Sequence, residues 1–290
     1  MRFNIKIAII ILACLFGGQL FADPVLSDFP LRHAHDAVLQ AKLDQTLANL
    51  DLAGSVRDHK LAVALVDITD PEVLRVAEVN GDEMMYAASL PKIGILLAAF
   101  ADIQQGRLKL DTKLKNSLIN MIRFSSNAEA TRVLNLIGKR RVNQILQSAP
   151  YRLYDPSVNG GIWVGKEYGK SPAFQRDPLH NISHGATAMQ VARFYYLLET
   201  GQLVNPLLTQ EMKEILSKPG IHHKFVKALD GRNVSIFRKS GTWHDWHADS
   251  ALVEGDKARY ILVGLVENSK GGEWLTQIAS AIDRQMLAAR

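Results

Sequence analysis

The chain has 290 residues, of which 47% are hydrophobic and 22% charged, and its formal net charge is +5. This composition is typical of a globular protein with one sizeable core, and the sequence has no repeat or low-complexity stretch that would predict a solenoid. The basic residues are scattered along the chain, so we expect no nucleic-acid partner.

The first residues have the pattern of a secretory signal peptide. Arg2 and Lys6 precede an apolar run over residues 7–16, and the small residue Ala22 ends the segment. This order of basic, apolar and small residues predicts a signal peptide over residues 1–22. We therefore expect a periplasmic or secreted protein.

Two other interpretations of this segment stay open. The first is a membrane anchor, although the apolar run is short for a hydrocarbon layer of about 30 Å. The second is lipidation at Cys14, because residues 11–14 loosely resemble a lipobox. Cys14 is the only cysteine, so a mature chain that has lost it has no disulfide and no thiol nucleophile. No later segment is apolar enough to span a membrane, so no stable span is expected after removal of the signal.

Residues 23–290 are predicted to form one catalytic domain, which begins with a helix and two strands. Leucines recur at helical spacing over residues 35–50 and predict an amphipathic helix. Residues 61–66 form a short apolar run that is typical of a buried strand. Residues 73–79 predict a second strand, which ends at an Asn-Gly turn.

The middle of the chain is mainly helical. Residues 93–103 predict one apolar helix, residues 118–137 carry another helical pattern, and residues 186–198 carry a third. Residues 150–182 are instead rich in Gly, Pro and aromatic residues and show little periodicity. An irregular stretch of this length inside a compact protein is usually functional.

The end of the chain mirrors its beginning. Residues 234–239, 250–253 and 260–266 predict three strands, and residues 274–289 predict a last amphipathic helix. Strands near both ends with helices between them predict a sheet assembled from both termini, with a helical region inserted.

This layout divides the domain into two lobes. We predict an α/β lobe made of about residues 35–88 and 205–290, and a helical lobe of about residues 89–204. The fold class is thus α/β plus all-α, with helices flanking the sheet.

Ser89 and Lys92 are the first candidate catalytic pair. They lie three residues apart at the start of a predicted helix, so both side chains fall on one helix face. A serine hydroxyl becomes a useful nucleophile when a nearby base accepts its proton, and a buried lysine can be that base. Pro91 fits the first turn of a helix. Alone, this spacing occurs often by chance and is a weak signal.

Two further motifs strengthen the prediction. Ser125-Ser126-Asn127 stands at the head of a helical stretch, where it could also be a simple helix cap. Lys239-Ser240-Gly241 ends a predicted strand, where it could also be a strand-to-turn break. Together with Ser89 and Lys92, the two motifs form an ordered set that chance rarely produces.

This ordered set resembles the motifs of the penicillin-recognising serine enzymes, which include class A β-lactamases and penicillin-binding proteins. The resemblance covers nearly all of residues 40–290 and is closest to the class A type. It implies the β-lactamase/transpeptidase-like fold, with an antiparallel sheet and a helical insert. It also implies a small-molecule β-lactam or a peptidoglycan-derived peptide as substrate, and it requires no cofactor.

The resemblance implies a role for each matching residue. Ser89 is acylated, Lys92 accepts its proton, and Ser125 relays a proton to the departing nitrogen. Asn127 binds the amide of the substrate's side chain. Lys239 supplies positive potential.

The same motif implies two further contacts. Ser240 binds the substrate carboxylate, and the backbone N–H groups of Ser89 and Thr242 form the oxyanion hole. Preorganised donors of this kind typically contribute about 3–4 kcal/mol each.

The sequence also departs from the class A pattern. That group has a glutamate, followed shortly by an asparagine, that activates water for release of the acyl group. Here residues 150–182 contain only Glu167 as a weak candidate, and Asp155 and Asp177 are the other carboxylates. Only 36 positions separate Ser89 from Ser125, fewer than in class A enzymes, which indicates a more open cleft.

Aromatic and histidine residues follow the last motif. Trp243 and Trp246 could stack on a ligand or could simply pack at a turn. His244 and His247 lack a third ligand in the sequence pattern, so we predict no metal site. His222 and its neighbour His223 are predicted to lie in a loop.

Three functions remain open on this basis. The first is a hydrolase that opens β-lactams through an acyl-enzyme at Ser89. The second is a D-Ala-D-Ala carboxypeptidase or transpeptidase, or another amide or ester hydrolase, on the same fold. The third is a non-catalytic binding protein. We expect a monomer in each case.

Overall fold

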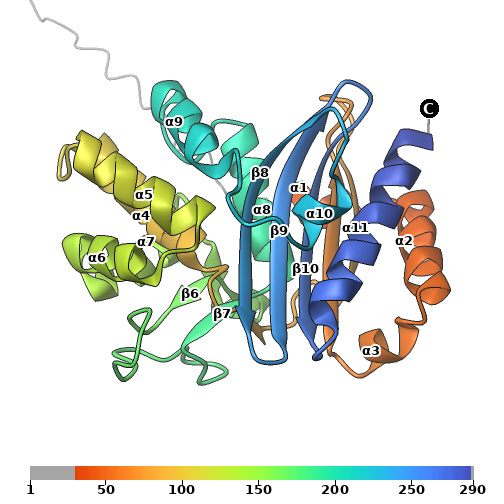
Figure 1. Ribbon diagram of the computed structural model, residues 1–290, viewed down its shortest axis with the longest axis horizontal. Coiled ribbons are helices and arrows are strands. Elements are labelled where there is room, and N and C mark those ends of the chain that lie inside the picture. Colours follow the sequence, from red (N-terminus) through yellow and green to blue (C-terminus); the bar gives the residue numbers. More distant parts are fainter. Residues whose placement is uncertain (1–29, 289–290) are drawn as a thin grey trace, which may run out of the picture.

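The computed structural model describes residues 30–288, and a five-stranded sheet lies at its centre (Figure 1). The strands are β1 (Leu61–Asp67), β2 (Arg75–Val79), β8 (Val234–Trp243), β9 (Trp246–Gly255) and β10 (Arg259–Glu267). Their order is β2-β1-β10-β9-β8, and all neighbours are antiparallel. Strands from near both ends of the chain therefore share one sheet, as predicted. The predicted signal peptide and Cys14 lie outside the described residues.

Helices cover both faces of the sheet. On one face, α2 (Ala37–Asn49) and α11 (Gly271–Ala288) lie side by side (Figure 1). On the other face, α8 (Ala188–Glu199) packs against β1 and β10. Because both faces are covered, every residue of β1 is buried.

Four helices form the inserted lobe beside β8. They are α4 (Lys92–Gln104), α5 (Thr112–Arg123), α6 (Asn127–Ile137) and α7 (Lys139–Gln147). Nearly all of α4 is buried, which explains why its sequence is apolar on all sides rather than amphipathic. This helix begins at the cleft between the lobe and the sheet, so its first turn is held firmly in place.

The helical pattern predicted over residues 118–137 is two helices rather than one. The chain breaks after Arg123 because Ser125 adopts a left-handed backbone conformation, with φ of 56°. The Ser126 hydroxyl then accepts a hydrogen bond from the N–H of Glu129, at 3.3 Å, and caps α6. The break projects the Ser125 side chain out of the helical register.

Several elements were not predicted from the sequence pattern. They are the helices α1 (Pro30–His33), α3 (Ala53–Arg57), α7, α9 (Pro206–Leu216) and α10 (Phe225–Ala228), and the short elements β3 (Met85–Tyr86), β4 (Tyr154–Asp155), η1 (Pro156–Val158), β5 (Gly160–Gly161), β6 (Trp163–Val164) and β7 (His184–Ala186). Residues 150–182 are therefore mostly irregular, as predicted. β7 joins β6 to β3, which connects this loop to the segment that leads into Ser89.

A buried ion pair supports the end of the sheet next to the lobe. Arg238 in β8 donates two hydrogen bonds to Asp249 in β9, at 2.7 and 2.8 Å, and both side chains are almost fully buried. Asp249 lies opposite Ser240 in the strand register. The pair therefore fixes the strand segment that carries Lys239 and Ser240.

Candidate active site

Ser89 and Lys92 meet at the start of α4, as the motif predicted. A tight turn precedes the helix, and Ala88 has a left-handed φ of 48° within it. Lys92 is fully buried, and its Nζ lies 3.1 Å from Ser89 Oγ. The serine hydroxyl is therefore within hydrogen-bond reach of a buried amine.

The break between α5 and α6 places two more polar groups on Lys92. The Lys92 Nζ donates to the Ser125 carbonyl and to Asn127 Oδ1, each at 2.7 Å, and lies 3.3 Å from Ser125 Oγ. The amine thus joins the first turn of α4 to the helix break. Its neighbours hold it in one position relative to Ser89.

Lys239 reaches the same point from β8. Its Nζ donates to Ser125 Oγ at 3.0 Å and to the Ser240 carbonyl at 2.6 Å. The Ser125 hydroxyl therefore lies between two buried lysines, Lys92 and Lys239. This continuous chain of groups can pass a proton from Ser89 towards Lys239.

Gly241 allows β8 to touch the turn that carries Ser89. A Cβ at this position would lie 2.1 Å from the carbonyl oxygen of Ala87 and 2.9 Å from the backbone nitrogen of Ser89. Any larger residue would push the strand away from the turn. The glycine therefore brings the backbone of β8 next to the N–H of Ser89, the arrangement that an oxyanion hole needs.

Burial sets the charge of both lysines. It lowers the pKa of Lys92 from 10.5 to about 7. The pKa of Lys239 is also well below its ordinary value, because of burial and then the charge of Lys92. Within residues 30–288, no carboxylate accepts a hydrogen bond from either amine. Lys92 can therefore be a neutral base near neutral pH.

An aromatic pair covers the other side of Lys92. The Lys92 Nζ lies 4.5 Å from the centre of the Tyr168 ring, which stacks on His184 with centroids 4.3 Å apart. Burial, followed by the charges of Lys92 and Lys166, lowers the pKa of His184 to about 3, so its imidazole is neutral. Sequence reasoning missed this pair, because neither residue stands in a recognisable motif.

Glu167 lies beside this pair, but its carboxylate is occupied. It forms an ion pair with Lys139 at 2.7 Å and accepts hydrogen bonds from Asn135 and Ser171. These contacts, with Lys139 first, lower the pKa of Glu167 to about 2. A carboxylate with so low a pKa is a weak base for activating water.

The other two carboxylates of the loop serve its own structure. Asp155 accepts hydrogen bonds from Ser157 and forms an ion pair with Arg152. Asp177 is buried and accepts a hydrogen bond from the Tyr154 hydroxyl. Their contacts hold the irregular chain in shape and do not reach Ser89.

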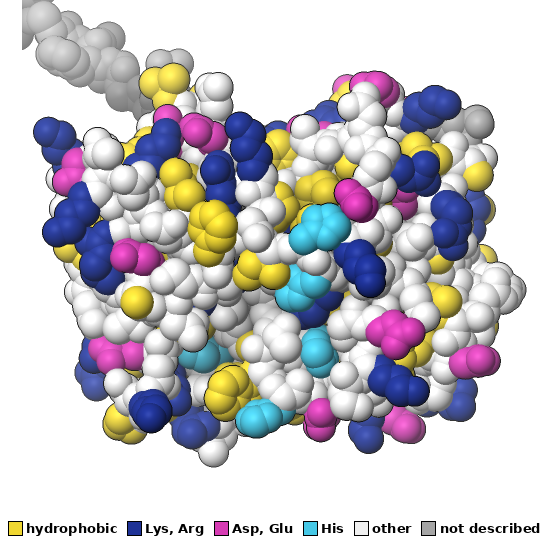
Figure 2. Space-filling model, viewed as in Figure 1, with side chains coloured by type: hydrophobic (Ala, Val, Ile, Leu, Met, Phe, Trp, Pro, Cys, Tyr) yellow, Lys and Arg dark blue, Asp and Glu magenta, His cyan; other side chains and the backbone are white. Residues whose placement is uncertain are grey.

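A cavity of about 610 Å³ opens beside Ser89, between the loop and the hairpin of β8 and β9. Asn127, Tyr168 and Thr242 line it together with Ser89. Figure 2 shows hydrophobic and histidine side chains along the middle of the molecular face that includes the sheet and the helical lobe. The cavity has room for a small acyl donor with its carbonyl near Ser89.

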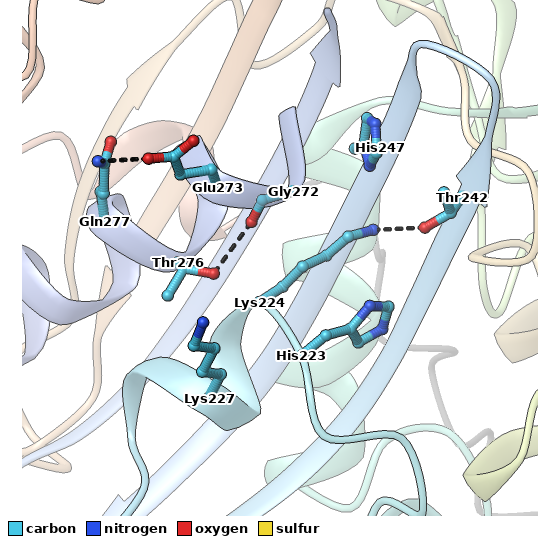
Figure 3. Close-up of a pocket in the computed structure, with 9 residues that line it drawn as sticks. All are labelled: His223, Lys224, Lys227, Thr242, His247, Gly272, Glu273, Thr276 and Gln277. Carbon is cyan, nitrogen blue, oxygen red and sulfur yellow. Dashed lines mark hydrogen bonds between the residues drawn. The ribbon is translucent and has the colours of Figure 1, made fainter. Parts of the chain in front are cut away.

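Ser240 and Thr242 lie on the same strand but contact a second set of residues. His223 Nε2 lies 3.3 Å from Ser240 Oγ. The Lys224 Nζ donates to Thr242 Oγ1 at 2.9 Å and to the Gly241 carbonyl at 2.6 Å, as Figure 3 shows for Thr242. His223, Lys224 and Thr242, but not Ser240, line a second cavity of about 590 Å³ between α10, β8 and the start of α11.

Lys224 is a second residue that sequence reasoning missed. Its side chain is buried, and burial lowers its pKa to about 8. The sequence shows only a lysine after His222 and His223, a segment predicted as a loop. Nothing in that local pattern separates it from a solvated lysine.

Aromatic residues of the hairpin lie at the cavity rim. Trp246 packs edge-on against Tyr86 with ring centroids 6.0 Å apart, and Trp243 stays 58% exposed with His244 against its face. Within the part of the chain that the structure describes, no group of His, Asp and Glu side chains is arranged to hold a metal ion. Likewise, none of the helices within residues 30–288 is long and apolar enough to cross a membrane.

Comparisons with known proteins agree with this geometry. A family model described as the beta-lactamase enzyme family matches residues 42–117 and 114–286. None of the curated proteins compared with the chain matches it.

Solved structures share the fold at low sequence identity. A class A β-lactamase from Bacteroides cellulosilyticus is 15% identical with a TM-score of 0.67, over 87% of this chain and 99% of that one. A PBP-A variant in an acyl-enzyme complex with penicillin G is 18% identical with a TM-score of 0.66, over 85% and 96%. A β-lactamase from Sphaerobacter thermophilus is 16% identical with a TM-score of 0.66, over 85% and 97%.

Proposed function

Because the chain belongs to the beta-lactamase enzyme family, we propose that it is an exported serine hydrolase that forms an acyl-enzyme at Ser89 and acts on β-lactams. The observation that carries the proposal is the contact between Ser89 and the buried amine of Lys92. The PBP-A structure, an acyl-enzyme with penicillin G, supports β-lactams as acyl donors for this fold.

The proposed acylation step uses the groups around Ser125. Neutral Lys92 takes the proton of Ser89, and Ser89 Oγ attacks the carbonyl carbon of the cyclic amide. The C–N bond then breaks, and the departing nitrogen receives a proton through the Ser125 hydroxyl. Water later cleaves the ester, which releases a carboxylic acid and restores the Ser89 hydroxyl.

The remaining site residues bind the substrate in this proposal. Asn127 holds the amide of the acyl arm, and Lys239 and Ser240 hold the substrate carboxylate. The backbone N–H groups of Ser89 and Thr242 stabilise the oxyanion, because the close approach at Gly241 brings β8 next to the turn that carries Ser89.

Intact-mass spectrometry after exposure to benzylpenicillin tests the proposal. We expect the mass of one penicillin to be added to the chain, and the adduct to map to Ser89. The Ser89→Ala variant is the control and should remain unmodified. A wild-type chain that gains no mass at any penicillin concentration and hydrolyses none would contradict the proposal.

A second candidate function keeps the acyl-enzyme but changes its fate. The chain would then be a carboxypeptidase or transpeptidase acting on cell-wall peptides, or a hydrolase of another amide or ester. The state of Glu167 favours it, because a carboxylate held by Lys139 with a pKa of about 2 is a poor base for deacylation. Rapid turnover of bound penicillin would argue against this candidate.

A further inference from the structure

The cavity beside Ser89 has an aromatic wall and a basic wall. Tyr86, Trp243 and Trp246 form the wall on the side of the sheet. Lys166 and Lys170 stand on the opposite side, on the loop.

The basic wall carries positive charge that the protein does not neutralise. Neither Lys166 nor Lys170 forms an ion pair with another residue of the described part of the chain. The carboxylate between them, Glu167, is paired with Lys139 at 2.7 Å. An anion entering the cavity would meet two unpaired ammonium groups.

The basic wall does not include Lys239 or Ser240 of the Lys-Ser-Gly motif. Asn127 and Thr242 line the cavity together with the two lysines, whereas Lys239 and Ser240 do not. Lys239 instead contacts Ser125, which the cavity does not include. A substrate bound at Ser89 therefore has one arm that faces Lys239 and another that faces the loop lysines.

We propose that the acyl arm of the natural substrate carries a carboxylate beside a flat apolar group, held by Lys166, Lys170 and the aromatic wall. The proposal rests on the function proposed above and adds the class of acyl donor. The aromatic rings contact the flat group, and the ammonium groups contact the carboxylate. The substrate would thus carry two anionic groups, one for each side of Ser89.

A matched pair of penicillins tests this substrate class. Benzylpenicillin and its α-carboxy derivative share the same ring system and differ by one carboxylate on the acyl arm. We expect the second-order rate constant for acylation of Ser89 to be about 3–10-fold higher for the α-carboxy compound at low ionic strength. The preference should shrink as salt is added, because these charges are exposed to solvent.

Charge-removing variants locate the preference. In the Lys166→Gln/Lys170→Gln double variant, the ratio of the two rate constants should fall to about one. The Lys227→Gln variant is the matched control, since Lys227 lines the separate cavity by α10. It should keep the wild-type ratio.

The outcomes separate the two proposals. Equal acylation by both compounds in the wild type would overturn the substrate class but not the acyl-enzyme. A preference that survives in the double variant would also overturn it, because the lysines would not be its source. If neither compound acylates Ser89, the proposed function fails and the substrate class fails with it.

Discussion

The two sides of the cleft are built differently. On the acylation side, Ser89, Lys92, Ser125 and Lys239 come from three separate segments and are joined by direct hydrogen bonds with no carboxylate among them. On the loop side, the nearest candidate base is Glu167, whose carboxylate is fully engaged by its own neighbours. One side is thus arranged to deprotonate a serine, and the other offers no comparable base for water.

If the proposed acyl-enzyme forms at Ser89, this contrast predicts that acylation and release depend on separate parts of the fold. Lys92 and Lys239 are buried, and burial lowers the pKa of Lys92 to about 7, so its amine can act as a base. The Lys92 amine lies over the ring of Tyr168 and has no anion beside it among the described residues. We therefore expect changes on the acylation side to have large effects and changes at Glu167 to have small ones.

The largest expected effect follows removal of the Lys92 amine. The Lys92→Met variant should acylate about 10²–10⁴-fold more slowly with benzylpenicillin, because no base remains next to Ser89. Lys224→Met, which removes another buried amine from the neighbouring cavity, is the control. An equal loss of rate in both variants would show that the loss comes from disturbance of β8 and not from removal of the base beside Ser89.

The second-largest effect is expected when the buried ion pair that supports β8 is removed. Asp249→Ala should lower the free energy of unfolding by about 3–5 kcal/mol, because it leaves the buried Arg238 guanidinium without its partner. Chemical denaturation followed by circular dichroism measures this change. The half-exposed pair of Arg132 and Glu129 is the comparison, and Glu129→Ala should shift the midpoint far less. A small loss for Asp249→Ala would mean that the strand does not depend on the pair.

On the loop side, burial of His184 should make the free energy of unfolding depend on pH. The pKa of His184 is about 3 in the fold and about 6.5 in the unfolded chain, so the unfolded chain binds the proton first as the pH falls. The contribution of neutral His184 to the free energy of unfolding is fully present above pH 6.5. It should fall below that pH, by about 2 kcal/mol at pH 5. Comparing unfolding at pH 7.5 and pH 5 in the wild type and in His184→Phe measures it. A pH slope that the substitution leaves unchanged would exclude His184 as its source.

The acylation rate should follow the titration of Lys92. Since its pKa is about 7, the amine is charged and inactive as a base at lower pH. The rate constant for labelling by a non-titrating penicillin should rise about tenfold per unit below pH 7 and level off above it. A flat profile between pH 5.5 and pH 9 would contradict the assignment of Lys92 as the base.

The smallest effect is expected at Glu167. Glu167→Gln should change the rate of acyl release by less than about twofold, because a carboxylate with a pKa of about 2 contributes little as a base. Timed loss of the penicillin adduct in wild type and variant measures it. A release that slows by orders of magnitude would make Glu167 the deacylating residue and would remove the contrast between the two sides.

Local pattern was enough to predict much of the fold and the acylation side. The strands of the sheet and helices α2, α4, α8 and α11 have clear periodicity. Ser89, Lys92 and Ser125 stand in motifs whose spacing carries the information. The position of Ser125 was predicted, but the left-handed turn that breaks the helix there was not.

The missed features depend on contacts between distant segments. Tyr168 stacks on His184 through the pairing of short strands, and Lys139 reaches Glu167 from a different helix. Lys224 acquires its buried environment only when its loop closes over β8 and β9. No local periodicity marks such residues, because their neighbours are set by the tertiary fold.

The lifetime of the Ser89 adduct tests the central contrast most directly. The wild-type chain is labelled to completion with benzylpenicillin, freed of excess penicillin, and followed by intact-mass spectrometry over time. We expect one adduct that forms quickly and is released at least about 100-fold more slowly than it forms. Penicillin hydrolysis with no accumulating adduct would contradict the contrast between the two sides of the cleft, because the acyl group would then be released as fast as it forms, although β-lactam hydrolysis at Ser89 would stand.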